Sequence, residues 1–145
     1  MAAVVSPEDR DLRLLLGEAR TIAVVGLSPD PRRPSNRVAT YLREHGYEIV
    51  PVNPAVDEVL GVRSYATLLD IPASTHIDVV DVFRRAEHTP DVARDAAAIG
   101  ARVLWLQEGI ISEEAMAIAQ DAGMEIIMGV CIQHVRERLM EEMDG

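Results

Sequence analysis

The sequence contains few cysteines and few aromatic residues, and both shortages exclude classes of site. A single cysteine, Cys131, among 145 residues excludes an internal disulfide and a cysteine-rich zinc site. Aromatic residues make up 3% of the chain, which leaves little ring surface for stacking the bases of a single-stranded nucleic acid. No two histidines share a helix at the spacing of metal ligands, so we expect no metal site.

Positive charge and long apolar runs are also scarce. The formal net charge is −10, which argues against a general affinity for nucleic acid or for an anionic membrane surface. No apolar run approaches the length that spans a membrane. The first residues lack the basic region and the apolar core of a signal peptide, and the expected location is therefore the cytoplasm.

Short apolar strands alternate with amphipathic helices along the chain. Hydrophobic residues make up 48% of the sequence and are mostly Val, Ile, Leu and Ala, which is typical of a buried parallel sheet covered by helices. The predicted strands are residues 21–26, 47–52, 77–83, 103–106 and 125–128. The predicted helices are residues 35–46, 65–69, 89–100, 112–123 and 132–143. Residues 55–63 are expected to be irregular.

This alternation predicts a Rossmann-like α/β fold of three layers, in which a five-stranded parallel sheet lies between two layers of helices. A chain of 145 residues suits a single domain. We expect residues 21–145 to form this domain and residues 1–20 to supply an N-terminal helix that packs on it. Ser6 and Pro7 are typical of the start of such a helix.

The order of the strands decides which loops meet. We expect the order 3-2-1-4-5, which places the topological switch point between strands one and four. The turn at Gly26 would then lie beside residues 107–109, with Asn53 and Phe83 on the same edge of the sheet. Ligands of open parallel sheets bind at the carboxyl ends of the strands around such a switch point, so these loops are the expected location of a site.

The turn after the first strand has the features of an anion site. The strand ends at Gly26, and a helix begins at Ser35. The loop between them carries Ser28, Arg32 and Arg33. The N–H groups at a helix start favour phosphate, and arginine adds charged hydrogen bonds. The alternative is that Gly26 is only a turn and that both arginines are solvated.

The motifs of the common nucleotide-binding proteins are incomplete. The sequence after the first strand has the first glycine of G-x-G-x-x-G but lacks the other two. Asn53 stands at the end of strand two, where an NAD-binding chain usually has an acid. The pattern G-x-x-x-x-G-K-[ST] of nucleotide triphosphatases is missing. These departures favour a ligand richer in phosphate than NAD.

Several longer blocks resemble a known family. They are IAVVGLSPDPRRPSNRVATYLREHGYEIVPVNP, VLGVRSY, DVVDVFRR, LWLQEGI and AGMEIIMGVC. Together they resemble the small stand-alone CoA-binding proteins of bacteria and archaea, the YccU-like family, which is similar to the CoA-binding domain of the succinyl-CoA synthetase α subunit. The resemblance runs from about Thr21 to Cys131.

The resemblance implies that CoA contacts the loops at the carboxyl ends of the strands. The residues implied to bind the pyrophosphate and the other phosphate are Gly26, Leu27, Ser28, Arg32, Arg33 and Ser35. The residues implied to border the adenosine are Asn53, Pro54, Phe83 and Arg84. The loop implied to close the far wall is formed by Gln107, Glu108 and Gly109.

The resemblance also implies that the chain holds the ADP part of CoA or of an acyl-CoA without catalysing a reaction. The synthetase α subunit has a second domain with a phosphorylated histidine, which has no counterpart here, so ligase activity by itself is not expected. Two other functions stay open: an NAD- or nucleotide-dependent enzyme, and a protein-interaction module with a vestigial pocket. A protein partner or a second copy of the chain is also left open.

Two further side chains lie near the same edge of the predicted sheet. Asp81, in the third strand, is expected to hydrogen-bond to a loop rather than to form an acid pair with Asp78, because alternation places the two on opposite faces. Cys131 follows the fifth strand. It either packs as a small buried residue or exchanges with the CoA thiol, and the sequence leaves that choice open.

Overall fold

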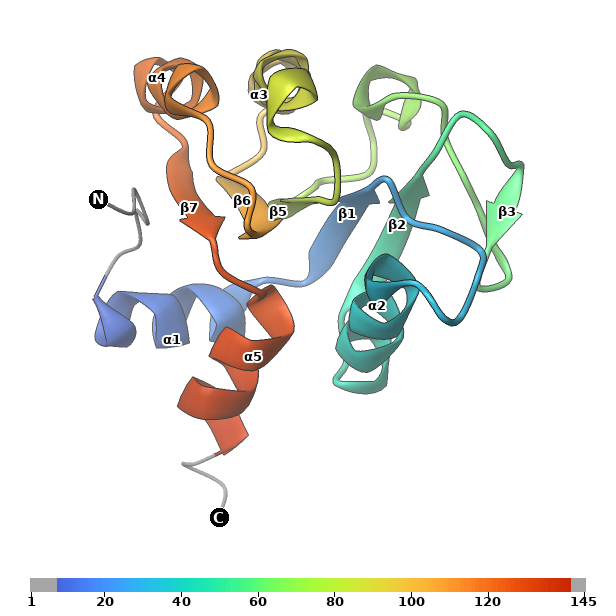
Figure 1. Ribbon diagram of the computed structural model, residues 1–145, viewed down its shortest axis with the longest axis horizontal. Helices are drawn as coiled ribbons and strands as arrows, with labels where there is room; N and C mark the ends of the chain where they lie inside the picture. Colours follow the sequence, from blue (N-terminus) through green and yellow to red (C-terminus); the bar gives the residue numbers. More distant parts are fainter. Residues whose placement is uncertain (1–7, 142–145) are drawn as a thin grey trace.

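Five parallel strands form one sheet with helices on both faces (Figure 1). The computed structural model describes residues 8–141. The strands of the sheet are β1 (Thr21–Val25), β2 (Glu48–Val52), β5 (Val79–Val82), β6 (Val103–Glu108) and β7 (Glu125–Gly129). Every neighbouring pair in the sheet is parallel. The predicted three-layer Rossmann-like α/β fold is confirmed.

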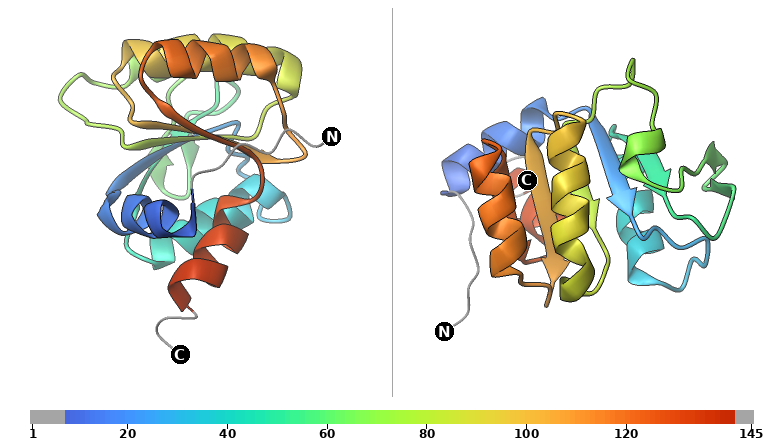
Figure 2. Two further views of the ribbon diagram at one scale, coloured as in Figure 1. Left: turned by 90° about the vertical axis from the view of Figure 1, so that its left-hand side faces the viewer. Right: turned by 90° about the horizontal axis from the view of Figure 1, so that it is seen from above.

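Helices cover the sheet on two sides, as the edge-on view of Figure 2 shows. One layer holds α1 (Asp9–Glu18), α2 (Pro34–Glu44) and α5 (Ile132–Arg136), which continues as the π-helical turn η3 (Glu137–Glu141). The other layer holds α3 (Thr89–Ala98) and α4 (Glu113–Asp121), and the short turns η1 (Leu68–Asp70) and η2 (Ala86–His88) adjoin α3. Among residues 8–141, no helix is both long and apolar enough to cross a membrane.

The first helix packs on the sheet through leucines. It begins at Asp9, with Glu8 as its N-cap, and the predicted start at Ser6 and Pro7 lies outside the described residues. Its apolar stripe joins the core cluster between the sheet and the layer of α2 and α5. The buried residues of this stripe are Leu12, Leu15 and Leu16.

The observed order of the strands differs from the prediction. The sheet runs β2-β1-β5-β6-β7, so the second strand lies at the edge instead of between the first and the third. The switch point therefore lies between β1 and β5. Gly26 borders the backbone of Phe83, and residues 107–109 lie beyond it, at the end of β6. The predicted strand order and the predicted placement of Gly26 beside residues 107–109 are both wrong.

Pro51 explains why β2 is an edge strand. The Tyr65 N–H donates to the Pro51 carbonyl oxygen at 3.0 Å, and the Asn53 N–H donates to the Tyr65 carbonyl oxygen at 2.8 Å. The backbone of Pro51 therefore faces away from β1. Proline has no N–H to give to a neighbouring strand and is confined to sheet edges. On this outer side β2 makes only an isolated parallel bridge, from Val52 to Tyr65, and β5 pairs with β1 instead.

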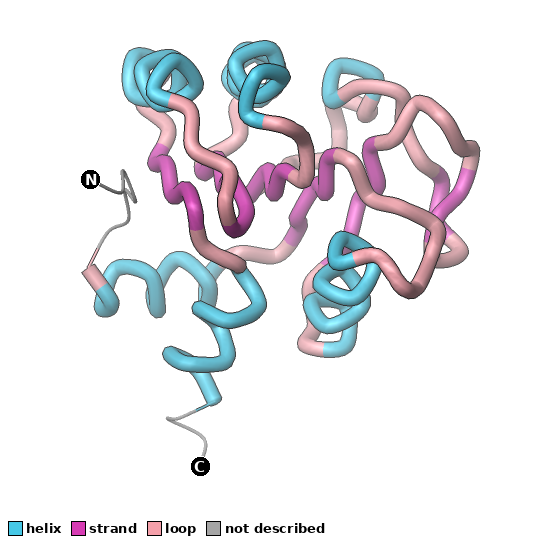
Figure 3. Tube along the Cα trace, in the orientation of Figure 1, coloured by secondary structure: helices cyan, strands magenta, loops and turns pink. Residues whose placement is uncertain are grey.

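A small hairpin occupies the segment that the sequence predicts as irregular (Figure 3). Strands β3 (Glu58–Val59) and β4 (Val62–Arg63) pair antiparallel around Leu60 and Gly61. Both turn residues have positive φ, +55° and +75°, as a tight hairpin turn requires. Leucine rarely adopts this conformation, so the residue pattern did not indicate the hairpin. Here Arg43 Nη1 donates to the Leu60 carbonyl oxygen at 2.6 Å.

A cluster of two tyrosines and an arginine fixes α5 against α2. Arg136 Nε donates to the Tyr47 hydroxyl at 3.1 Å, and its Nη1 donates to the Tyr41 hydroxyl at 3.3 Å. The Tyr41 hydroxyl in turn donates to Glu141 Oε2 at 2.6 Å. Burial and the hydrogen bond to Glu141 raise the pKa of Tyr41 to about 12, so this hydroxyl keeps its proton. The contacts hold together the two helices whose first turns border the candidate site.

A buried acid lies in the middle of the sheet. Asp81, in β5, is fully buried and lies in register with Val24 of β1 and Trp105 of β6. Neither of its carboxylate oxygens has a hydrogen-bond partner among the described residues, so the predicted hydrogen bond to a loop is wrong. Burial raises the pKa of Asp81 well above its ordinary value, which favours the neutral acid.

Gly26 allows the turn after β1 to pass close to the end of β5. Its φ is +86°, in the left-handed region that favours glycine. A Cβ atom at this position would lie 2.5 Å from the Phe83 carbonyl oxygen, closer than any stable contact. The positive φ and the short distance to the Phe83 backbone therefore both require glycine at this position.

Replacing Gly26 with Ala is expected to lower the free energy of unfolding by about 2 kcal/mol or more, because it adds a collision with backbone to the strain of a positive φ. Gly100 is the matched control: its φ is +74° and a Cβ there would meet nothing within 4 Å. Gly100→Ala should cost only about 1 kcal/mol. Urea unfolding of both variants measures the difference. Equal losses of unfolding free energy would show that the contact with Phe83 does not destabilise Gly26→Ala further.

Replacing Asp81 with Val is expected to stabilise the protein increasingly as the pH rises from 4 to 8. Because the pKa of Asp81 is raised in the folded state, its contribution to stability is complete below the ordinary aspartate pKa and is lost as the pH rises toward the folded value. The wild-type free energy of unfolding then falls by up to about 1.4 kcal/mol per pH unit relative to the variant. Urea unfolding across this range measures the difference, and a constant difference would mean that Asp81 ionises normally.

Candidate functional site

Two adjoining cavities lie at the carboxyl ends of the strands, on the face that α2 and α5 cover. They share Pro34, at the start of α2, and Phe83, at the end of β5. The smaller has a volume of about 300 Å³ and is lined by Gly26, Ser28, Arg33, Pro34, Ser35 and Phe83. The larger has a volume of about 520 Å³ and is lined by Pro34, Arg37, Val38, Phe83, Gln107, Glu108, Cys131, Gln133 and His134.

Internal hydrogen bonds fix the loop between β1 and α2. The Ser28 N–H donates to Ser35 Oγ at 3.0 Å, and Asn36 Nδ2 donates to the Ser28 carbonyl oxygen at 2.9 Å. Ser28 Oγ accepts from the Asp30 N–H at 3.0 Å. The start of α2 is thereby held against the end of β1, and the wall of the smaller cavity is preformed.

The two arginines of this loop have different surroundings. The Arg32 guanidinium donates to both carboxylate oxygens of Asp30, at 3.1 and 3.0 Å, and its side chain is mostly exposed. These hydrogen bonds hold the pKa of Asp30 below its ordinary value. Arg33 is the N-cap residue of α2 and lines the smaller cavity. Arg32 is not among the residues that line either cavity.

The smaller cavity is cationic although the protein is strongly acidic. Its lining includes Arg33 and no acid, whereas the chain as a whole carries a net charge of −10. Arg33 makes no side-chain cap to the first turn of α2. The first N–H groups of a helix have no acceptor within the helix and carry partial positive charge. The site is therefore suited to an anion.

The larger cavity combines an apolar wall with neutral amides. Val38, Phe83 and Cys131 supply the apolar part. Gln107 is buried, and its Oε1 accepts from the Ile132 N–H at 3.2 Å, so it fixes the start of α5. Its Nε2 is not used in that bond. The apolar wall and the amides suit an uncharged chain that contains amide groups, and Arg37, Glu108 and His134 also line the cavity.

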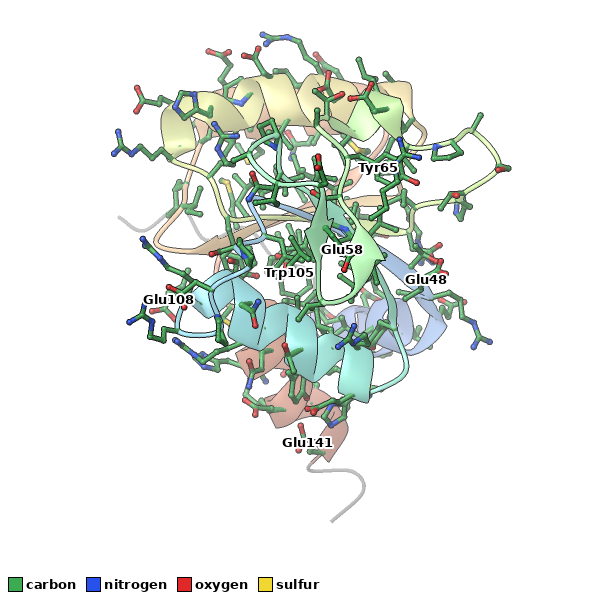
Figure 4. All side chains as sticks on the ribbon, turned by 90° about the vertical axis from the view of Figure 1, so that its right-hand side faces the viewer. Glu48, Glu58, Tyr65, Trp105, Glu108 and Glu141 are labelled. Carbon is green, nitrogen blue, oxygen red and sulfur yellow. The ribbon has the colours of Figure 1, made fainter. Side chains whose placement is uncertain are left out.

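Glu108 and His134 form the mouth of the larger cavity. Glu108 Oε1 lies 3.9 Å from His134 Nδ1, and both side chains are largely exposed. Figure 4 shows Glu108 at the rim of the molecule and Trp105, of the same strand, in the interior between the helix layers. Gly109 follows with φ of +79° and turns the chain away from the sheet.

Two of the predicted site residues join loops together. Asn53 Nδ2 donates to the Leu27 carbonyl oxygen at 2.9 Å, and its Oδ1 accepts from the Ala55 N–H at 2.9 Å. The Leu27 side chain is fully buried in the core, so only its backbone borders the turn. Pro54 is exposed. Asn53 therefore positions the loop after β1 against the end of β2.

Arg84 lies on the other face of the sheet. It lines a third cavity, of about 210 Å³, together with Val52, Leu68 and His88. Gly26 lies between the two faces, because β1 leads to α2 on one side and β5 leads to α3 on the other. A ligand that crosses the sheet edge at Gly26 can reach both sides.

The structure brings together most of the predicted residues and adds some that the sequence analysis left out of the site. Gly26, Ser28, Arg33, Ser35 and Phe83 share one cavity, and Gln107 and Glu108 line the adjoining one. The residues added are Pro34, Arg37, Val38, Cys131, Gln133 and His134. The rule that ligands bind at the carboxyl ends of parallel strands indicates the position of Cys131, and the first turn of the following helix belongs to the same edge.

A separate cavity lies away from this edge of the sheet. A cavity of about 310 Å³ lies along the outer edge of the sheet, where Glu48 and Tyr65 are labelled in Figure 4. None of the predicted site residues lines it. Within residues 8–141, no three His, Cys, Asp or Glu side chains gather closely enough to hold a metal ion.

Comparison with known proteins assigns the chain to a family. The family described as "CoA binding domain" matches residues 20–136. The Bacillus subtilis (strain 168) protein YneT, described as uncharacterized, is 41% identical over 128 residues, which are 88% of this chain and 93% of YneT. A hypothetical protein from Pyrococcus horikoshii OT3 has a solved structure with a TM-score of 0.89 and 39% identity, and the match covers 97% of this chain and 99% of that one.

The family domain also occurs within larger enzymes. The α subunit of the ADP-forming acetate–CoA ligase II of Pyrococcus furiosus is 29% identical over 122 residues, which are 78% of this chain. This chain spans only 27% of the length of that subunit. The family match over residues 20–136 includes the β1 turn and the sheet edge on which the candidate site lies, and the chain therefore belongs to the CoA-binding domain family, as the resemblance in its sequence predicts.

Proposed function

We propose that the protein binds CoA or an acyl-CoA, without catalysis of its own, at the carboxyl edge of its sheet. The observation that carries the proposal is the acid-free, arginine-bearing cavity at the start of α2, which opens into a larger apolar and amide-lined cavity. CoA has the same division: a phosphate-rich ADP part and an uncharged arm with two amides. Membership of the family supports this choice of ligand.

The pyrophosphate is assigned to the smaller cavity. Gly26 and the backbone of Leu27 allow close approach, and Ser28 and Ser35 supply polar groups around the start of α2. Arg33 would give charged hydrogen bonds to the phosphates. Arg32 is assigned a lesser part because its guanidinium already pairs with Asp30.

The two ends of CoA are assigned to opposite sides of Gly26. The adenosine lies toward Asn53, Pro54 and Arg84, at the ends of β2 and β5. The amide-bearing arm lies in the larger cavity, where Phe83 forms the floor and residues 107–109 form the far wall. This arrangement brings the thiol end of CoA toward Cys131. Held there, CoA is bound rather than consumed, as expected of a carrier, sensor or regulatory partner.

Calorimetric titration of the purified protein with CoA, 3′-dephospho-CoA, NAD and ATP tests the proposal. CoA is expected to bind most tightly, and loss of the 3′-phosphate should weaken binding. Binding of NAD alone would contradict the proposal and favour a nucleotide-dependent enzyme. Failure of all four ligands to bind would favour a protein-interaction module.

Replacing Arg33 with Ala should weaken CoA binding by about tenfold or more, because a hydrogen bond to a charged group contributes about 1.5–3 kcal/mol. Arg10→Ala is the control, since it changes the net charge equally but lies in α1, where its side chain is largely exposed. Titration at one fixed salt concentration compares the two variants. Equal CoA affinities of the two variants would show that Arg33 does not contact CoA and acts only through the net charge of the protein.

A further inference from the structure

The buried acid Asp81 lies two residues before Phe83, which lines the larger cavity. Asp81 and Phe83 are two residues apart on the same extended segment, so their side chains leave the same face of the sheet. Phe83 lines the cavity, while the Asp81 carboxyl is fully buried and has no hydrogen-bond partner among the described residues. The carboxyl therefore lies on the same face of the sheet as the cavity but outside its lining.

The wall and the surroundings of Asp81 belong to one core cluster. Val24 and Trp105, which flank Asp81 in register, are members of it. Val38 and Cys131, which line the cavity, are members as well, and Phe83 packs against it. Residues of one core cluster therefore adjoin the carboxyl and also line the cavity.

No neighbouring charge compensates the carboxyl. The titratable groups that border the cavity are Arg37 of α2, Glu108 of β6, and Cys131 and His134 at the start of α5. The helix α1 buries only leucines against the sheet, and its Arg13 donates to the Leu139 carbonyl oxygen. Arg136 of α5 donates to the hydroxyls of Tyr47 and Tyr41. Burial is the sole cause that shifts the pKa of Asp81, so none of these groups contributes. Ionisation of Asp81 consequently requires water to enter the cluster.

We propose that CoA binding and protonation of Asp81 are coupled, so that the protein takes up a proton at this carboxyl when CoA fills the larger cavity at high pH. The inference rests on the proposed function. The ionised carboxylate needs water, and the adjoining cavity is the space from which water can reach it through a displaced wall. CoA excludes that water and needs the wall in place. By thermodynamic reciprocity, ionisation of Asp81 must weaken CoA binding.

Titration of the wild type and of Asp81→Asn with CoA between pH 6 and 9.5 tests the coupling. Asparagine has nearly the same shape and stays neutral at every pH. The phosphate and thiol of CoA are the same in both experiments, so the ratio of the two affinities isolates Asp81. Repeating the titrations in buffers with different enthalpies of ionisation counts the protons taken up.

The wild-type affinity is expected to fall relative to Asp81→Asn by up to about tenfold for each pH unit above the pH at which Asp81 ionises in the free protein. The wild type should also take up one proton per CoA that the variant does not. The same pH dependence in both proteins would overturn this inference and leave the proposed function intact. Failure of both proteins to bind CoA at any pH would overturn the two together.

A direct measurement on the wild type covers the case in which Asp81→Asn does not fold. The carboxyl carbon resonance of Asp81 can be followed by NMR as the pH is changed, with and without saturating CoA. The midpoint of its titration is expected to move to higher pH when CoA is bound. A midpoint that CoA does not move would contradict the coupling.

Discussion

The close approach of Gly26 to the backbone of Phe83 is the constraint on which the rest of the site depends. The Gly26 N–H donates to the Val52 carbonyl oxygen at 2.8 Å, and the Phe83 N–H donates to the Val25 carbonyl oxygen at 2.9 Å. These bonds join the ends of three strands at one point. Because no side chain fits between Gly26 and Phe83, the chain can leave β1 for α2 on one face while β5 leads to α3 on the other.

The two cavities follow from that divergence of helices. Where successive strands send their helices to opposite faces, the carboxyl edge of a parallel sheet is left open. The start of α2 supplies positive partial charge on one side of the opening, and the apolar side chains of the core continue into its wall. An acidic protein can therefore present a cationic, partly apolar site without a large patch of basic residues.

The sequence predicts the elements and the composition of the site better than their arrangement. The β-branched run before Gly26 and the loop to Ser35 are local signals, and they are found where expected. The strand order has one local signal, Pro51, whose missing N–H favours an edge position for β2. The significance of Asp81 could not be predicted, because alternation assigns its face but not the absence of a partner. The hairpin at Leu60 was missed because leucine seldom adopts positive φ.

The buried, unpaired carboxyl of Asp81 lowers the stability of the fold, and its position near Phe83 relates this loss to the cavity. An unpaired buried polar group destabilises a protein by roughly 1–3 kcal/mol, and the rest of β5 is valine, which would fill the same place in the strand without that loss. Sequences depart from the locally best choice mainly where function requires it. Asp81 lies in register with Trp105 and two residues before Phe83, and of these only Phe83 lines the cavities. The departure is therefore better explained by the cavity above Asp81 than by the packing of the sheet around it.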